Sequence, residues 1–190
     1  MLGTRKEIIM LKFELGVWVT REFPSGWSHV IIGSFAADPQ FDSQAAPDLF
    51  CYDQNTGVGA FFATFKNGQL DDETAVPNGP HKVGGNHIFS RRWTHVVHIP
   101  VFAIASRASH IVKLLLFYDA TSGVAEVYET DGRGNLILKK QHNGWRTSWE
   151  QIIAGQFGKA NLLFYDAANE AGEFSFINKS GDLQRVEGWS

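Results

Sequence analysis

Cysteine is nearly absent from this sequence of 190 residues: Cys51 is the only one, so no intrachain disulfide can form. Cys51 lies in the apolar run 48–52, a setting typical of a buried structural thiol rather than of a catalytic one. Long hydrophobic runs are absent as well, because the apolar stretch 8–11 ends at Lys12 and is too short for a signal peptide or a membrane span. We therefore expect no membrane span and a reducing, cytoplasmic setting, with leaderless export as the alternative.

Concentrated positive charge is also missing. The chain has 17 Lys and Arg against 20 Asp and Glu, a net charge of −3, and its basic residues are scattered. Because phosphate backbones need a concentrated basic surface, nucleic acid is not an expected partner. No Gly-x-Ser-x-Gly elbow, Walker loop or His-Glu-x-x-His helix occurs. His95 and His98 stand three apart in a strand-like run and would point to opposite faces, so no metal site is predicted. We expect no enzyme and no cofactor.

An internal repeat is the main feature that the sequence does contain. Each copy begins with a tryptophan and reaches an apolar strand that ends in aspartate; the pairs are Trp27 with Asp53, Trp93 with Asp119, and Trp149 with Asp166. The separations are 26, 26 and 17 residues, so the third copy is the minimal one. Fifteen residues after each aspartate stands a glycine: Gly68, Gly134 and Gly181. A shared turn with positive φ explains glycines in register, because glycine adopts that conformation without a Cβ penalty.

Each copy contains four short runs rich in aromatic and β-branched residues, which predict strands. In the third copy these runs are 151–153, 162–165, 173–177 and 183–186, and helical periodicity is absent from the chain. Four strands in about 45 to 50 residues is the size of one propeller blade. The sequence therefore predicts an all-β, β-propeller-like domain with repeats at 27–92, 93–148 and 149–190, preceded by a partial N-terminal blade at 1–26.

A single blade cannot cover both of its faces, so neighbouring blades must stack on it. Two closures are open: a small four-bladed ring, or two chains that pool their blades, which favours a homo-oligomer. The irregular segment 71–92, with its Pro, Gly and acidic residues, is predicted to be a long surface loop. The chain ends with Gly188-Trp189, which we match to Gly144-Trp145 at the close of the second repeat.

Short motifs in the repeats resemble the integrin-type propeller repeats known as FG-GAP or VCBS-like repeats. The motifs are Gly33-Ser34-Phe35 and Gly155-Gln156-Phe157, the Asp48-Leu49 pair, and the Asp131-Gly132-Arg133-Gly134 turn. The resemblance covers the chain from about Trp27 to the C-terminus and implies a propeller with a binding or adhesive role. The calcium loop of that family is not matched: only Asp38 and Asp42 occupy the first such loop, without alternating spacing, so calcium is not predicted.

Tryptophans are the candidate ligand residues. Trp27, Trp93 and Trp149 fit either equivalent sugar-stacking platforms or core between blades, and their regular repetition favours core. The unit ends are the better candidates for ligand binding, because they combine aromatic rings with polar groups able to bond hydroxyls; they contain His142, Asn143, Trp145, Arg146 and Trp189.

Two carboxylate pairs, Asp119 with Glu126 and Asp166 with Glu173, could mimic a glycosidase dyad. A catalytic pair rarely recurs once per structural repeat, so hydrogen bonding across a turn is the preferred interpretation. The sequence therefore predicts a non-catalytic, lectin-like module that binds a glycan or glycoprotein through repeated sites. The alternative is a protein–protein interaction scaffold that uses the 71–92 segment as a contact surface.

Overall fold

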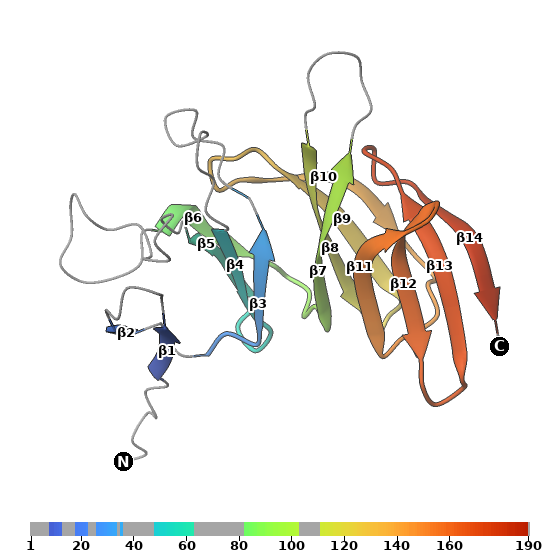
Figure 1. The fold of residues 1–190 in the computed structure, drawn as a ribbon, viewed down its shortest axis with the longest axis horizontal. Coiled ribbons are helices and arrows are strands. Elements are labelled where there is room, and N and C mark those ends of the chain that lie inside the picture. The colour runs from blue at the N-terminus through green and yellow to red at the C-terminus, as the bar shows by residue number, and fades with distance from the viewer. Residues whose placement is uncertain are drawn as a thin grey trace. The chain divides into compact units, whose positions relative to one another are not determined.

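The computed structural model describes residues 8–12, 18–22, 26–33, 35, 48–62, 82–102 and 111–189, and within them every regular element is a β-strand. Three four-stranded antiparallel sheets and one two-stranded sheet account for these strands (Figure 1). The all-β class and the repeated four-stranded unit are therefore confirmed. No sheet in the described part of the chain closes on itself, and closure into a propeller stays a prediction.

The chain divides into two compact units. Unit 1 comprises residues 1–88 together with 132–134, and unit 2 comprises 89–131 and 135–190. In unit 1, β1 (Ile8–Lys12) pairs with β2 (Trp18–Glu22) in the two-stranded sheet. The first four-stranded sheet follows in the order β3-β4-β5-β6. Its strands are β3 (His29–Gly33), β4 (Asp48–Asp53), β5 (Val58–Phe62) and β6 (Lys82–Ile88).

Unit 2 contains the second and third sheets. The second sheet has the order β10-β9-β8-β7, with β7 (His95–Phe102), β8 (Ile111–Asp119), β9 (Val124–Thr130) and β10 (Leu136–His142). The third sheet has the order β11-β12-β13-β14, with β11 (Gln151–Phe157), β12 (Ala160–Asp166), β13 (Ala171–Ile177) and β14 (Leu183–Trp189). Each of these sheets is a meander, in which strands that are consecutive in the chain pair with each other.

One sequence prediction is wrong: segment 71–92 is not one long loop, because it contains β6. This strand pairs with β5 and supplies the fourth strand of the first sheet. Gly84 and Gly85 suggested a loop, and they lie where the register of β6 shifts, between Val83, which pairs with Phe61, and His87, which pairs with Gly59. Glycine within a strand often marks such a bulge. Residues 63–81, including Gly68, lie outside the described residues. The other two register glycines share one backbone setting, with φ of +83° at Gly134 and +84° at Gly181.

Each sheet has two distinct apolar faces. We call them the Tyr face, which carries Tyr52, Tyr118 or Tyr165, and the Trp face, which carries the neighbouring residue Cys51, Phe117 or Phe164 and the repeat tryptophan. Successive residues of a strand point to opposite sides, which separates the two sets. In β12 the burial alternates accordingly: Leu162 and Phe164 are buried, whereas Leu163 and Tyr165 are half-buried.

The core of unit 2 joins unlike faces of its two sheets. Leu114, Leu116 and Tyr118 of β8 are fully buried in one cluster with Leu162 and Phe164 of β12 and with Trp149. The three β8 residues belong to the Tyr face of the second sheet, whereas the two β12 residues and Trp149 belong to the Trp face of the third. The first strands of the two sheets, β7 and β11, also pack together. Full burial of one such side chain contributes about 1.5–3 kcal/mol, so this stacking stabilises unit 2.

Candidate functional site

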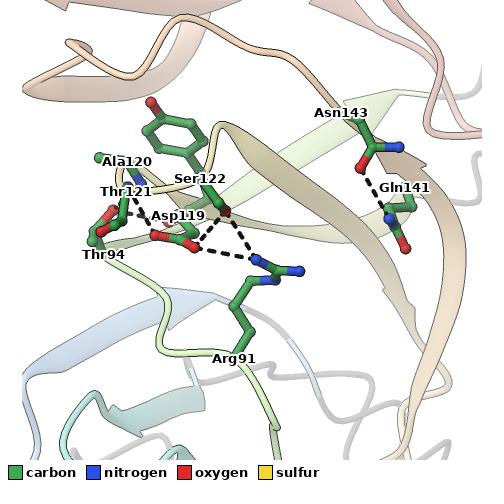
Figure 2. A network of polar contacts seen from close by, with 9 residues as sticks. Arg91, Thr94, Asp119, Ala120, Thr121, Ser122, Gln141 and Asn143 are labelled. Atoms are coloured by element: carbon green, nitrogen blue, oxygen red, sulfur yellow. Dashed lines mark hydrogen bonds and ion pairs between the residues drawn. The ribbon is translucent and has the colours of Figure 1, made fainter.

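A hydrogen-bonded turn follows the repeat aspartate in every copy. In the second sheet, Asp119 Oδ1 accepts a hydrogen bond from the Thr121 backbone N–H at 2.9 Å, and Oδ2 accepts one from Ser122 Oγ at 2.5 Å (Figure 2). Arg91 Nη1 lies 3.3 Å from the same Oδ2. Thr94 Oγ1 closes the network: it accepts from the Ala120 N–H and donates to the Tyr118 carbonyl. This arrangement fixes the turn between β8 and β9.

The other two copies repeat this chemistry with small changes. Asp53 accepts from the Asn55 N–H at 2.9 Å and from Thr56 Oγ1 at 2.5 Å. Asp166, whose side chain is fully buried, accepts from Asn169 and from Ser148 Oγ. The hydrogen bond from Ser148 lowers the pKa of Asp166 below its ordinary value. Burial acts to raise the pKa of Asp119, but hydrogen bonds from Ser122, Thr121 and Arg91 outweigh it and lower that pKa. These carboxylates act as structural hydrogen-bond acceptors.

The glutamates proposed as their partners bond elsewhere. Tyr128 Oη donates to Glu126 at 2.5 Å, and Ser175 Oγ donates to Glu173 at 2.8 Å. Burial of the Tyr128 phenol raises its pKa, and the hydrogen bond to Glu126 and the charge of that residue raise it further. Each acidic residue therefore has its own local structural partner.

The repeat tryptophans lie in packed surroundings. Trp93 is 1% exposed and Trp149 is 8% exposed, and Trp27 packs edge-on against Phe62 at 5.9 Å between ring centroids. This burial favours the interpretation that they are core residues. Arg146 also has a packing role, because its guanidinium lies 5.2 Å from the Trp149 ring and its Nε is 3.6 Å from Asp166.

Three of the predicted ligand residues, His142, Asn143 and Trp145, lie close together at the end of β10, beside Gln141. Gln141 Nε2 donates to Asn143 Oδ1 at 3.1 Å, and both side chains are exposed (Figure 2). The Trp145 ring is 5.3 Å from the ring of His142 and 5.3 Å from that of Phe164. Trp145 is thus half-buried against the core of unit 2, whereas the side chains of Gln141, Asn143 and Arg146 are exposed.

His142 also links the two sheets of unit 2. Its Nε2 lies 2.8 Å from the carbonyl oxygen of Gly181, the positive-φ glycine in the last turn of the third sheet. His87, the last residue but one of β6, makes the same kind of contact: its Nε2 lies 2.8 Å from the carbonyl oxygen of Gly134. A histidine near the end of the fourth strand therefore bonds a turn glycine in both cases.

The strand register corrects one sequence match. His142 pairs with Ala125, and Trp189 pairs with Gly172; these partners stand at the same distance after Asp119 and Asp166. Trp189 therefore corresponds to His142, not to Trp145. Its ring lies against Gly172, where an added Cβ would come within 2.1 Å of the indole.

The Tyr face of the third sheet is open, although the same face of the second sheet is buried. Ile153 is 43% exposed and Trp189 is 45% exposed, and Phe174 packs beside Trp189 at 5.6 Å. On the same face of the second sheet, Leu116, Tyr118 and Val127 are fully buried in the core, whereas their equivalents Leu163, Tyr165 and Phe174 are half-buried in the third sheet. The sequence prediction did not identify this face, since nothing in the repeat distinguishes covered from uncovered copies.

A second open apolar surface lies on the Trp face of β3. Val30 is 51% exposed and Ile32 is 66% exposed, and they pair with Cys51 and Leu49 of β4. Val96 and Ile152, the residues equivalent to Val30 in the other two sheets, are each only 8% exposed. Apolar residues therefore recur at this position whether or not the surface is covered.

Among the described residues, no group of three or more His, Cys, Asp or Glu side chains is placed to hold a metal ion. No described helix is long and apolar enough to cross a membrane. Comparisons with family models, with curated proteins and with solved structures found no match.

Proposed function

We propose that this chain is a non-catalytic binding module that contacts other proteins through its open sheet faces. One observation carries the proposal: the Tyr face of the third sheet is open, with Ile153 43% and Trp189 45% exposed, where the second sheet buries the equivalent face. An apolar face left open on a repeat protein is a typical binding surface. The repeated sheets act as blades of a propeller-like scaffold, in keeping with the resemblance to integrin-type repeats.

Substitution at the open face tests this proposal. The full chain, immobilised as wild type and as Ile153→Glu, is exposed to an extract of the source cells, and retained proteins are identified. Ile137→Glu is the matched control, because Ile137 has a similar exposure of 51% on β10 of the second sheet. We expect Ile153→Glu to lose partners that the control retains, since a carboxylate buried in a contact loses its hydration. Identical retention by all three proteins contradicts the proposal.

A lectin-like function is the second candidate. It is favoured by the exposed amides of Gln141 and Asn143, which lie beside the His142 and Trp145 rings, and by the accessible indole of Trp189. Amides bond sugar hydroxyls, and aromatic rings stack on pyranose C–H surfaces. A glycan array probed with multivalent protein tests it. Binding that Asn143→Ala or Trp189→Ala abolishes supports this candidate, and a blank array counts against it.

A further inference from the structure

The contact inside unit 2 shows how one repeat sheet packs on the next. The Tyr face of the second sheet receives the Trp face of the third, and the first strands of the two sheets, β7 and β11, pack together. Val97 and Ile99 of β7 lie on the Tyr face, and Ile152 and Ala154 of β11 lie on the Trp face. The contact therefore joins two different surfaces, in a fixed order along the chain.

Both halves of this contact recur on the protein without a cover. The Tyr-face half is on β11 of the third sheet, where Ile153 is the equivalent of Val97 and is 43% exposed. The Trp-face half is on β3 of the first sheet, where Val30 is the equivalent of Ile152 and is 51% exposed, with Ile32 beside it at 66%. One chain thus has both an open Tyr face, on the third sheet, and an open Trp face, on β3.

This inference rests on the proposed function: we propose that the protein bound at the open faces is a second copy of this chain, in a head-to-tail contact. The Trp face of β3 in one copy seats on the Tyr face of the third sheet in the other, as the third sheet seats on the second within unit 2. Such a heterologous contact uses two different patches of each copy. It removes Val30, Ile32 and Ile153 from water together, which supplies the driving force.

Trp189 supplies a polar element of the same contact. Its position is that of His142, whose ring nitrogen lies 2.8 Å from the Gly181 carbonyl of the following sheet. The indole Nε1–H is a donor only, so in the assembly it donates to a backbone carbonyl of the incoming sheet. The contact between copies then reproduces both the apolar packing and the ring-to-carbonyl hydrogen bond seen within unit 2.

The solution mass of the full chain, measured by light scattering and sedimentation over a range of concentrations, tests the inference. We expect a wild-type mass above the 21.2 kDa of one chain. Ile153→Glu and Ile32→Glu should each weaken association by at least about tenfold, because each leaves a charge in an apolar contact. Ile137→Glu, the matched control, should associate as the wild type does.

Mixing the two variants separates a head-to-tail contact from one between like faces. Ile153→Glu retains an intact β3 surface, and Ile32→Glu retains an intact third sheet, so an equimolar mixture should form a two-chain species that neither variant forms alone. No mixed species, or a wild type of 21.2 kDa at every concentration, overturns the inference. Circular dichroism of each variant checks that the sheets are folded.

The solution-mass test of self-association and the capture test of the proposed function can fail independently of each other. A monomeric protein whose capture of other proteins still depends on Ile153 overturns the second copy as occupant and leaves a protein-binding module. A protein that associates head to tail, and whose Ile153→Glu variant loses no other partner, restricts the open face to self-assembly.

Discussion

The repeat carboxylates are held by their turns rather than offered to a ligand. Asp119 and Asp166 each accept hydrogen bonds from the residues that follow them, and their pKa values are lowered. A carboxyl whose pKa is lower in the folded than in the unfolded protein stabilises the fold above the unfolded value of about 3.9. That stabilisation is lost as the pH falls through the folded pKa.

Substitution of Asp166 by Asn should therefore reduce stability at pH 7 and flatten the loss of stability on acidification below about pH 4. The amide cannot accept all the hydrogen bonds that the carboxylate receives from Ser148 and Asn169. Urea unfolding from pH 7 to pH 2 measures the effect. Glu187→Gln, at an exposed carboxyl on β14, is the control. Equal acid sensitivity in Asp166→Asn and wild type contradicts this role for Asp166.

Cys51 should be inert in the folded protein. Its side chain is fully buried, and burial raises the pKa of its thiol to about 12, so very little thiolate exists near neutral pH. A thiol reagent such as DTNB at pH 8 should label less than about a tenth of the native protein in the time that labels the urea-unfolded chain completely. Rapid labelling of the native protein would contradict this placement.

At the scale of elements, the glycine turns join the strands in a conformation that other residues tolerate poorly. Gly181 has a φ of +84°, and a Cβ there would lie 2.9 Å from the Cβ of Lys140. Gly181→Ala should lower the free energy of unfolding by about 1–3 kcal/mol, measured by urea denaturation. Gly85→Ala is the control, since its added Cβ meets nothing within 4 Å. A similar small effect at both sites would show that the turn tolerates a side chain.

The repeat in the sequence was sufficient to predict the strands and the structural turns, because the aspartates and glycines in register encode local hydrogen bonds and backbone dihedrals. It was not sufficient for β6, whose Gly84 and Gly85 carry no side chains to mark a strand and which depends on pairing with β5. It also mismatched Trp189 with Trp145, because a shared Gly-Trp pair suggested an alignment that the strand register does not support.

The orientation of the faces could not be predicted either. Phe117 and Tyr118 are adjacent in β8 and both fully buried, so the strand shows no alternation of apolar and polar residues. Strands covered on both sides have continuous apolar runs, and these do not specify which neighbour covers which face. Only the packing of the second sheet on the third shows that the Tyr face receives the Trp face.

At the scale of the whole molecule, the proposed head-to-tail contact would repeat between copies the packing seen between the two sheets of unit 2. Within unit 2 the Tyr face of the second sheet receives the Trp face of the third. In the proposed assembly, the open Tyr face of the third sheet would receive the Trp face of β3 from a second copy. If the rotation between copies closes, the sheets form a ring, and if it does not, the assembly grows as a filament. Closure would also multiply weak sites such as the Gln141–Asn143 amide pair, and so raise avidity without any new contact.

Such an assembly makes thermal stability depend on protein concentration. Partners that bind the folded chain and not the unfolded one shift the unfolding equilibrium by mass action, so the wild-type Tm should rise by about 1–3 °C for each tenfold increase in concentration. Ile153→Glu should have a Tm that does not depend on concentration, because its third-sheet face cannot receive a second copy. Differential scanning calorimetry of both proteins across two decades of concentration measures the difference, provided that unfolding is reversible. A wild-type Tm as constant as that of the variant would mean that the open faces do not hold copies of this chain together.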